Sequence, residues 1–400
     1  MIGFHEAVAA VAARTAPAGE EEVPLTAAAG RVLAGPLAAR LDLPRFDATA
    51  MDGWAIRRKG SFPARLRVLG TLAAGRVSNA GVGPGEALKI MTGAPIPPGA
   101  DAVVPVEEAR EEAGIVIVET APRALAHVRR RGEIFAAGAN VLEGGCVLTP
   151  ARLAVAASAG HATLRVVRRS RAGLLVTGEE IAPAGTEPGP GKIPNSNGPL
   201  LHAALTRAGA HVTDLGVSRD DEAELSARLQ AGVAAGLDLL VTTGGVSAGD
   251  FDLVAAALNS LGAEIVFHKV AIRPAKPVLF ARLGATLVFG LPGNPVSAAV
   301  GFDFFVRAAL RTMAGLPPLP APFAAALLAP VRNAGGRLAL LPGRLHFAGG
   351  IVAVEPVTTR GSHDILAQAG ADAIFLVPNG TSLRAGESVL VYPAGTDTTL

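Results

Sequence analysis

The pattern of hydrophobic and polar positions changes at residue 172. From there, apolar runs such as AGLLVTG (172–178) and LDLLVTTGG (237–245) alternate with segments of helical spacing such as NGPLLHAALTRAGA (197–210). Strands that alternate with helices indicate a doubly wound, mostly parallel α/β sheet, which we assign to residues 172–316. The apolar segment NPVSAAVGFDFFVRAALRTMAG (294–315) predicts a long helix that closes this domain.

Two local features of the α/β domain are predicted in more detail. The segment RDDEAELSARLQAGVAAG (219–236) is expected to form a helix with Asp220 as its N-terminal cap. The segment AEIVFHKVAI (263–272) is predicted to be a strand, so that Lys269 and Arg273 lie at even spacing on one strand face.

The remaining segments have the short alternating runs and Gly/Pro turns that are typical of β structure. A β-rich domain is predicted for residues 44–139, inserted between an N-terminal part at 1–43 and its continuation at 140–171. The proline-rich linker LPPLPAP (316–322) precedes a small C-terminal β domain, residues 317–400. The predicted fold class is therefore α/β plus β, in several domains.

Composition narrows the function classes. The 400 residues include 36 Lys and Arg against 34 Asp and Glu, and a formal net charge of +2 argues against general binding to nucleic acid or to a membrane surface. The single cysteine, Cys146, excludes an internal disulfide and a multi-cysteine metal site. The chain has no apolar run of membrane-spanning length, and MIGFHEAVAAVAAR does not read as a signal peptide, so we expect a cytoplasmic protein.

The strand-end loop TTGGVSAGDFD (242–252) is the strongest chemical signal in the pattern. Glycines after a strand let backbone N–H groups approach a phosphate, and nearby carboxylates can hold a Mg²⁺ that bridges phosphate oxygens. The candidate residues of this loop are Gly244, Gly245, Ser247, Asp250 and Asp252. The loop lacks the GK[ST] of a P-loop and the spacing of GxGxxG, and an ordinary glycine turn followed by a helix cap remains the alternative.

The segment HKVAIRPAKPV (268–278) gathers three cations in a chain that has only five lysines. Lys269 and Arg273 precede Lys276, which lies in a stiff turn beside Pro277. Fixed cations near a strand end suit a small oxyanion, because an ion pair at 4 Å is worth ~4 kcal/mol at an effective dielectric constant of 20. On charge alone, a solvated basic edge is equally consistent.

Two more strand ends carry polar loops. In GLPGNPVSA (290–298), Ser297 falls in the first turn of the predicted helix, where a hydroxyl and free N–H groups can bind an anion, and helix capping by Asn294 is the other interpretation. TGEE (177–180) brings Glu180 to the end of another strand. Ligands bind at the carboxyl ends of strands in open α/β sheets, so the convergence of these loops indicates one site.

Several segments in sequence order resemble the molybdopterin molybdenumtransferase family, which includes bacterial MoeA and the E domains of gephyrin and its plant counterpart. The matching segments are PRFDATAMDGWAI, IMTGAPIPPGADAVVPVE, TGEEI, PNSNGPLL, TTGGVSAGDFD, AIRPAKPV and GLPGNPVSA. By periodicity alone the first two are only loops. No HExxH is present, so a metalloprotease site is a poor alternative.

This resemblance implies an elongated four-domain protomer that forms a homodimer, with residues 1–43 and 140–171 as a linker and dimerisation domain. The α/β domain would resemble the molybdopterin adenylyltransferases. The implied reaction converts molybdate and adenylyl-molybdopterin to molybdenum cofactor and AMP, with Mg²⁺. The implied partners are a second copy of the chain and, beyond it, molybdopterin adenylyltransferase and molybdoenzyme apoproteins.

The resemblance also implies roles for single residues. The phosphate or adenylate cradle would be Gly244, Gly245 and Ser247, and the Mg²⁺ or water-positioning acids would be Glu180, Asp250 and Asp252. The oxyanion pocket would include Arg273 (in place of a frequent lysine), Lys276, Pro277 and Ser297, with positive charge added nearby by Lys269. Two further residues, Asn294 and Ser362, would bind substrate or cofactor. Asp52 and Thr92 would reach the site from the partner subunit.

The chain departs from the family pattern at two positions. Ile134 stands where the family commonly has the Asp of GED, and Gly349 stands where an arginine commonly follows Phe347 by two positions. Arg344 still matches the earlier arginine of that segment. The departures leave open a second hypothesis, a non-catalytic molybdopterin-binding scaffold or carrier. A third hypothesis keeps only the α/β domain's likeness to adenylyltransferases and competence proteins.

Overall fold

The structure is a computed structural model and describes residues 1–245 and 253–394. By internal packing the chain forms two units, one made of Met1–Glu21 with Val167–Leu400 and the other of Glu22–Val166. The chain passes from one unit to the other at residues 21–22 and returns at 166–167. Three predicted site residues, Ser247, Asp250 and Asp252, lie outside the described residues.

The first unit contains a six-stranded sheet in the order β16-β13-β17-β21-β20-β18. Its strands are β13 (Arg171–Thr177), β16 (His211–Ser218), β17 (Leu239–Thr243), β18 (Glu264–Phe267), β20 (Leu279–Leu283) and β21 (Thr286–Leu291). The first four in spatial order are parallel, and β20 is antiparallel to both β21 and β18. The mostly parallel sheet predicted from the alternating pattern is confirmed.

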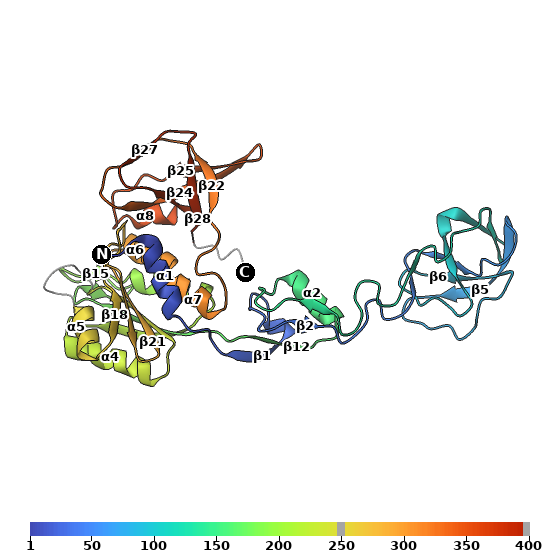
Figure 1. The fold of residues 1–400 in the computed structure, drawn as a ribbon, viewed down its shortest axis with the longest axis horizontal. Coiled ribbons are helices and arrows are strands. Elements are labelled where there is room, and N and C mark those ends of the chain that lie inside the picture. The colour runs from blue at the N-terminus through green and yellow to red at the C-terminus, as the bar shows by residue number, and fades with distance from the viewer. Residues whose placement is uncertain (246–252, 395–400) are drawn as a thin grey trace. The chain divides into compact units, whose positions relative to one another are not determined.

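Helices cover both faces of this sheet (Figure 1). One face packs α3 (Asn197–Arg207), α6 (Pro295–Gly301), the π-helical turn η3 (Phe302–Val306) and α7 (Arg307–Met313). The other face packs α4 (Glu222–Ala234) and α5 (Leu253–Ser260), whose leucines contact Leu175, Leu240 and Val288. The long closing helix is thus present, with one π turn inside it. Two short strands, β14 (Ile181–Ala182) and β15 (Ile193–Pro194), pair beside this domain.

The N-terminal helix belongs to the α/β core and not to the linker domain in which we placed residues 1–43. Helix α1 (Phe4–Arg14) buries Phe4, Ala7, Val8 and Val11 in the same core as the closing helix. The Phe4 ring meets Phe304 edge-on at 5.2 Å. The apolar stripe of α1 therefore finds its partner 300 residues away, which periodicity along α1 cannot reveal.

Two local predictions are wrong. The cap of α4 is Asp221, whose carboxylate accepts from the Glu224 N–H at 2.7 Å, while Asp220 accepts from the Glu179 N–H at 3.3 Å. The strand expected at 263–272 ends at Phe267. After it, β19 (Ile272–Arg273) joins a different sheet, so Lys269 and Arg273 do not share a strand face.

That second sheet forms the C-terminal domain, in the order β19-β24-β25-β22-β28-β26. Its other elements are β22 (Phe323–Leu327), β23 (Val331–Asn333), β24 (Leu338–Ala348), β25 (Ile351–Pro356), α8 (Ile365–Ala369), β26 (Ala373–Val377), β27 (Thr381–Leu383) and β28 (Ser388–Pro393). Strand β19 runs parallel to β24, with Ile272 opposite Leu338 and Arg273 opposite Ala339. A two-residue strand contributed by the α/β segment therefore extends the C-terminal sheet.

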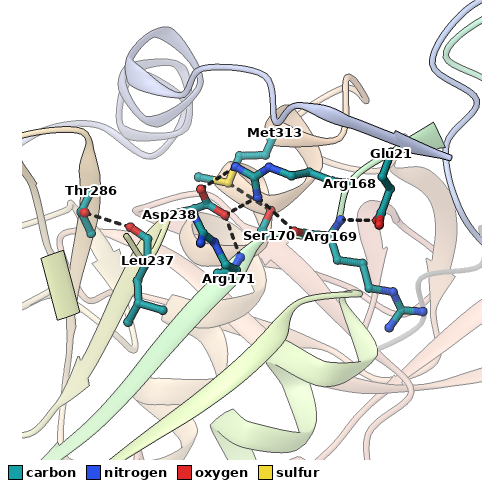
Figure 2. A network of polar contacts seen from close by, with 9 residues as sticks. All are labelled: Glu21, Arg168, Arg169, Ser170, Arg171, Leu237, Asp238, Thr286 and Met313. Carbon is teal, nitrogen blue, oxygen red and sulfur yellow. Dashed lines mark hydrogen bonds and ion pairs between the residues drawn. The ribbon is translucent and has the colours of Figure 1, made fainter. Parts of the chain in front are cut away.

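The amino end of the α/β sheet is fastened by a charged clamp (Figure 2). The Arg168 guanidinium donates two hydrogen bonds of 2.7 Å to Asp238, whose carboxylate also accepts from the Arg171 N–H at 2.7 Å. Burial works against ionisation of Asp238, but the Arg168 and Arg171 hydrogen bonds outweigh it and lower the pKa of this carboxyl. The clamp joins the start of β13 to the start of β17.

The second unit is mostly β. Its six-stranded sheet, in the order β7-β4-β6-β5-β9-β8, consists of β4 (Gly53–Ile56), β5 (Ala64–Leu72), β6 (Glu86–Ile90), β7 (Ala102–Pro105), β8 (Ala109–Glu112) and β9 (Ile115–Val118). The short elements are β1 (Glu20–Pro24), β2 (Leu37–Ala38), β3 (Ala48–Thr49), β10 (Val128–Arg129), β11 (Asn140–Leu142), α2 (Pro150–Ser158), β12 (Thr163–Val167) and the 3₁₀ turns η1 (Leu25–Ala27) and η2 (Val106–Glu108). No helix within the described residues is long and apolar enough to cross a membrane.

Candidate active site

Three neighbouring parallel strands end at the same edge of the α/β sheet. Val176 of β13 is opposite Thr243 of β17, and Thr243 is opposite Leu291 of β21. From β13 the chain crosses to β16 on one side and then to β17 on the other, so the strand order reverses between β13 and β17. This is the topological switch point at which open α/β sheets bind ligands.

A cavity of about 710 Å³ lies at that point, and we call it the switch-point cavity. Its lining includes Thr177, Glu180, Asn197, Thr243, Gly244, Gly245, Pro277, Pro292, Gly293, Asn294 and His363. The three strand-end loops predicted to converge, 177–180, 242–252 and 290–297, each contribute described residues to this lining. The Glu180 side chain is exposed and has no hydrogen-bond partner within the described residues, so its carboxylate is available to a ligand or a cation.

The two glycines of the loop after β17 are required by the geometry. Gly244 has φ +92°, and a Cβ there would lie 2.4 Å from the Thr177 carbonyl oxygen. Gly245 has φ +63°, with Thr177 Oγ1 at 3.1 Å from its would-be Cβ. Both values of φ lie in the left-handed region that side chains disfavour. The backbone therefore passes so close to the end of β13 that glycine is needed at both positions.

A hydrogen-bond network around Asn197 links the start of α3 to the ends of β17 and β21. The Asn197 amide nitrogen donates to Thr243 Oγ1 and to the Gly293 carbonyl oxygen, both at 2.8 Å. Thr243 Oγ1 in turn donates to the Pro292 carbonyl oxygen at 3.1 Å. Carbonyl oxygens only accept, so the direction of each bond is fixed and Asn197 Nδ2 spends both hydrogens. Asn197 Oδ1 is buried without a partner within the described chain.

A second cavity, of about 640 Å³, adjoins the first, and we call it the cationic cavity. Four of its lining residues are cations, namely Arg273, Lys276, Arg337 and Arg360, and the lining also includes Ser297 and Ser362. No Asp or Glu is among the described residues that line it. Pro277, Pro292 and Asn294 line both cavities. A surplus of unpaired positive charge around a cavity favours a multivalent anion.

Contacts between the α/β domain and the C-terminal domain form this cavity. Asn294 Nδ2 donates to Ser362 Oγ at 3.0 Å, and the Val296 N–H donates to the Ser362 carbonyl oxygen at 3.2 Å. Asn294 occupies the N-cap position of α6, with a proline in the first turn as the capping interpretation expects, but its side chain makes no cap bond. The Ser362 carbonyl oxygen instead takes one of the free N–H groups at the start of α6.

The loop that carries Arg360 and Ser362 is organised by Asp364. Its carboxylate accepts from the Arg360 N–H at 3.0 Å and from the Ala367 N–H at 3.3 Å, capping α8. These two backbone bonds, the Arg360 bond first, lower the pKa of the Asp364 carboxyl. Asp364 thereby fixes the loop while its own charge is engaged by the backbone.

In the second unit, the two family loops that periodicity left unassigned come together. Gly53 of β4 is opposite Ile90 of β6, so the loop before one strand and the loop after the other leave the same end of the sheet. Asp52 Oδ1 accepts from the Thr92 N–H at 2.6 Å and from Thr92 Oγ1 at 2.7 Å. The Thr92 backbone bond is the larger cause of a lowered pKa at Asp52, so this carboxyl stays ionised.

Comparison with known sequences now identifies the family. The chain matches the MoeA N-terminal region (domains I and II) over residues 2–160, a probable molybdopterin binding domain over 173–312 and the MoeA C-terminal region (domain IV) over 324–394. The chain belongs to the MoeA family. A relative from Mycobacterium tuberculosis, named molybdopterin molybdenumtransferase 2, is 38% identical over 94% of this chain and 93% of its own. The molybdopterin molybdenumtransferase of Bacillus subtilis is 34% identical over 93% and 90%.

The MoeA fold is also shown by solved structures. Two crystal structures of the molybdopterin biosynthesis MoeA protein from Pyrococcus horikoshii superpose with TM-scores of 0.82 and 0.83, at 30% and 26% sequence identity. Each covers 98% of this chain, and the match takes in 99% and 100% of theirs. The likeness therefore extends over both units and not over the α/β domain alone, which leaves the adenylyltransferase and competence-protein hypothesis without support.

The two departures from the MoeA pattern lie outside both cavities. Gly349 forms the turn between β24 and β25 with φ +57°, a conformation that favours glycine, and it does not line the cationic cavity. Ile134 is 63% exposed in the second unit. Lys269, expected to add charge to the oxyanion pocket, lines neither cavity. Arg344, which matches a family arginine, is likewise in neither lining.

Sequence reasoning missed three residues of the cavities. Asn197 belongs to the PNSNGPLL motif, but the sequence did not predict that it lines a cavity. The same holds for Arg337 and Arg360, which belong to no motif. For Asn197 the signal was available, because an amide at a helix start beside a strand-end loop can tie loops together. For the two arginines, no local pattern distinguishes them from other surface arginines of the C-terminal domain.

Proposed function

We propose that this protein catalyses insertion of molybdate into adenylyl-molybdopterin, with release of AMP, as a step of molybdenum cofactor biosynthesis. The observation that carries the proposal is the pair of adjoining cavities. One has the glycine backbone that a phosphate requires, and the other has four cations and no described acid, as an oxyanion requires. The names of the relatives, molybdopterin molybdenumtransferases, support the same reaction.

Positioning and electrostatics account for the chemistry on this view. The backbone at Gly244 and Gly245 lines the switch-point cavity and leaves room there for the phosphate of adenylyl-molybdopterin, and Arg273 and Lys276 hold molybdate in the cationic cavity. The shared residues Pro277, Pro292 and Asn294 keep the two reactants adjacent. Holding reactants together removes the entropy cost of their encounter, and fixed cations stabilise charge that develops as AMP leaves.

Mg²⁺ is part of the proposal. Glu180 provides an uncommitted carboxylate on the switch-point cavity, and a hard oxygen ligand of this kind together with phosphate oxygens suits Mg²⁺. Within the described residues no three His, Cys, Asp or Glu side chains form a ready metal cluster, and the other two predicted ligands, Asp250 and Asp252, fall outside them. Bound Mg²⁺ would neutralise charge on the phosphoanhydride.

The decisive experiment is an AMP-release assay with the purified full-length chain. Supplied with adenylyl-molybdopterin, molybdate and Mg²⁺, the protein is expected to release AMP and to form cofactor that activates a molybdoenzyme apoprotein. Omission of Mg²⁺ or addition of a chelator should suppress the release. Tight pterin binding with no AMP above a no-enzyme control contradicts the proposal and supports the carrier hypothesis.

We also propose a homodimer in which Asp52 and Thr92 of one copy complete the site of the other. Its test is subunit mixing between Asp52→Ala and Lys276→Ala chains, each nearly inactive alone. In a two-fold dimer, random mixing makes half of the dimers heterodimers with one intact site, so about a quarter of wild-type activity should return. Mixtures that stay as inactive as the parent variants would show that both residues act within one copy.

A further inference from the structure

We infer that Arg337 and Arg360, both of the C-terminal domain, bind the oxyanion in the cationic cavity and set its affinity for a tetrahedral dianion. The inference rests on the proposed function for the identity of that dianion as molybdate. Among the cations that line this cavity, the family resemblance pointed only to Arg273 and Lys276. The structure adds two cations to the lining of the same cavity.

Arg337 is held against the strand that carries Arg273. Its Nη1 donates to the Ile272 carbonyl oxygen at 3.0 Å, and Ile272 directly precedes Arg273 on β19. Its own carbonyl oxygen accepts from Asn333 Nδ2 at 2.8 Å, and Asn333 is fully buried. A guanidinium has five N–H donors, so one bond to Ile272 orients Arg337 and leaves donors for an anion.

Arg360 is positioned through its backbone, which leaves its side chain uncommitted. Asp364 accepts from the Arg360 N–H, and Thr359 Oγ1 bonds to the N–H and the carbonyl oxygen of Gly361, so the loop is fixed on both sides. Within the described residues the Arg360 guanidinium makes no hydrogen bond or ion pair of its own. The nearby Asp364 carboxylate is taken by two backbone N–H groups and by capping of α8.

Charge balance explains why these cations need a ligand. Four cations line one cavity of about 640 Å³, and no described acid lines it with them. Like charges gathered in this way destabilise the folded chain, and a bound dianion removes that repulsion. Two of the four come from the α/β domain and two from the C-terminal domain, so full charge complementarity exists only where the domains meet.

The two cations of the α/β domain and the two arginines of the C-terminal domain should therefore differ in function. Lys276 directly precedes Pro277, which lines both cavities, so we expect Arg273 and Lys276 to act on the reacting groups. Arg337 and Arg360 do not line the switch-point cavity, so we expect them to affect molybdate binding and not pterin binding. Their removal should raise the KM for molybdate while kcat at saturating molybdate changes little.

The experiment compares Arg337→Gln, Arg360→Gln and Arg360→Lys in the full-length chain. The matched control is Arg384→Gln, because Arg384 is an exposed arginine of the same domain, paired with Glu387 and outside both cavities. Molybdate alone is titrated calorimetrically into each protein, and the KM for molybdate and for adenylyl-molybdopterin is then measured by AMP release. Unfolding curves check that each variant folds.

Each glutamine variant is expected to weaken molybdate binding and raise its KM about tenfold, the usual scale for one charge-assisted hydrogen bond. Arg360→Lys should recover most of the loss, and the KM for the pterin should stay within about twofold. Molybdate binding and KM unchanged in Arg360→Gln, or raised equally in Arg384→Gln, would overturn the inference. Arg360 lies on an exposed loop, so its variants decide the matter even where Arg337→Gln does not fold.

Failure of the inference is distinguishable from failure of the proposed function. Wild-type protein that binds molybdate through these arginines but never releases AMP would leave the oxyanion site standing and remove the reaction. Wild-type protein that turns over while both glutamine variants keep its molybdate KM would leave the reaction standing and remove the two arginines.

Discussion

The two adjoining cavities differ in the charge of the residues that line them. The switch-point cavity is lined by glycines, prolines and hydrogen-bonded amides, with Glu180 as its acid, and nearly all of it comes from loops at the ends of one sheet. The cationic cavity is lined by four cations from two domains. We therefore infer that the switch-point cavity selects its ligand by close approach of the backbone, whereas the cationic cavity selects its ligand by charge.

The largest expected effect comes from removing a cation of the α/β domain. Lys276→Ala should lower the rate of AMP release roughly 10²–10³-fold, the range found when one preorganised charge stabiliser is removed. Lys276→Arg keeps the charge and should retain much of the rate. The matched control is Arg282→Ala, an exposed cation at the end of β20 that lines neither cavity. A Lys276→Ala rate near wild type would contradict selection by charge.

The next largest effect is expected from adding a side chain where the backbone at Gly244 approaches Thr177. Gly244→Ala should lower AMP release by about 10²-fold, because its Cβ would lie 2.4 Å from the Thr177 carbonyl oxygen and the loop must move. Gly209→Ala is the control, since Gly209 has φ +83° but open space around the added Cβ. Both variants place a Cβ at a positive φ, and only Gly244→Ala adds a clash. Equal activity of the two variants would show that close approach is not needed.

A smaller effect is expected from the amide network. Asn197→Ala leaves the Gly293 carbonyl oxygen and Thr243 Oγ1 without their donor, which should cost about 2 kcal/mol in unfolding free energy and about tenfold in AMP release. Asn140→Ala, which removes an exposed local bond to the Glu143 carboxylate and lines neither cavity, is the comparison. Chemical denaturation and the AMP assay measure both. An effect on molybdate KM alone would place Asn197 with the cationic cavity instead.

The smallest effect is expected from Asp364, which organises the loop beside the cationic cavity and whose contribution to stability depends on pH. The pKa of Asp364 is lowered from its ordinary value of 3.8, so its contribution to stability is present above that value and lost as pH falls through the lower native pKa. Asp364→Asn should raise the molybdate KM roughly twofold at neutral pH, as expected for an exposed electrostatic contact. The stability difference from wild type should shrink in acid. A difference that grows in acid would contradict this sign.

The sequence allowed much of the switch-point cavity to be predicted. Its residues sit at strand ends, and parallel strands with alternating helices bring those ends to one edge without any further information. Prediction from the sequence was poorer where two neighbouring residues were equally suited to the same role. Asp220 and Asp221 are adjacent acids with the same capping propensity, and only the backbone geometry made Asp221 the cap.

Only two of the four cations that line the cationic cavity could be predicted from the sequence. Arg273 and Lys276 are near each other along the chain, whereas Arg337 and Arg360 join them through the pairing of β19 with β24 and the docking of Ser362 on Asn294. Those contacts link residues 65 or more positions apart, and nothing in the local periodicity specifies them. The expected single strand across 263–272 shows the same limit, since its last residue pairs in another sheet.

The sequence by itself determined the strand and helix alternation, the glycine loops and the motifs that mark a MoeA-family chain. These are local properties, because side-chain burial repeats with the period of each element and a tight loop needs glycine where φ is positive. Tertiary structure decided that α1 packs on Phe304, that Asp52 meets Thr92 and that four cations share one cavity. Such contacts depend on which distant surfaces fit and bury one another, and they exist only once the chain has folded.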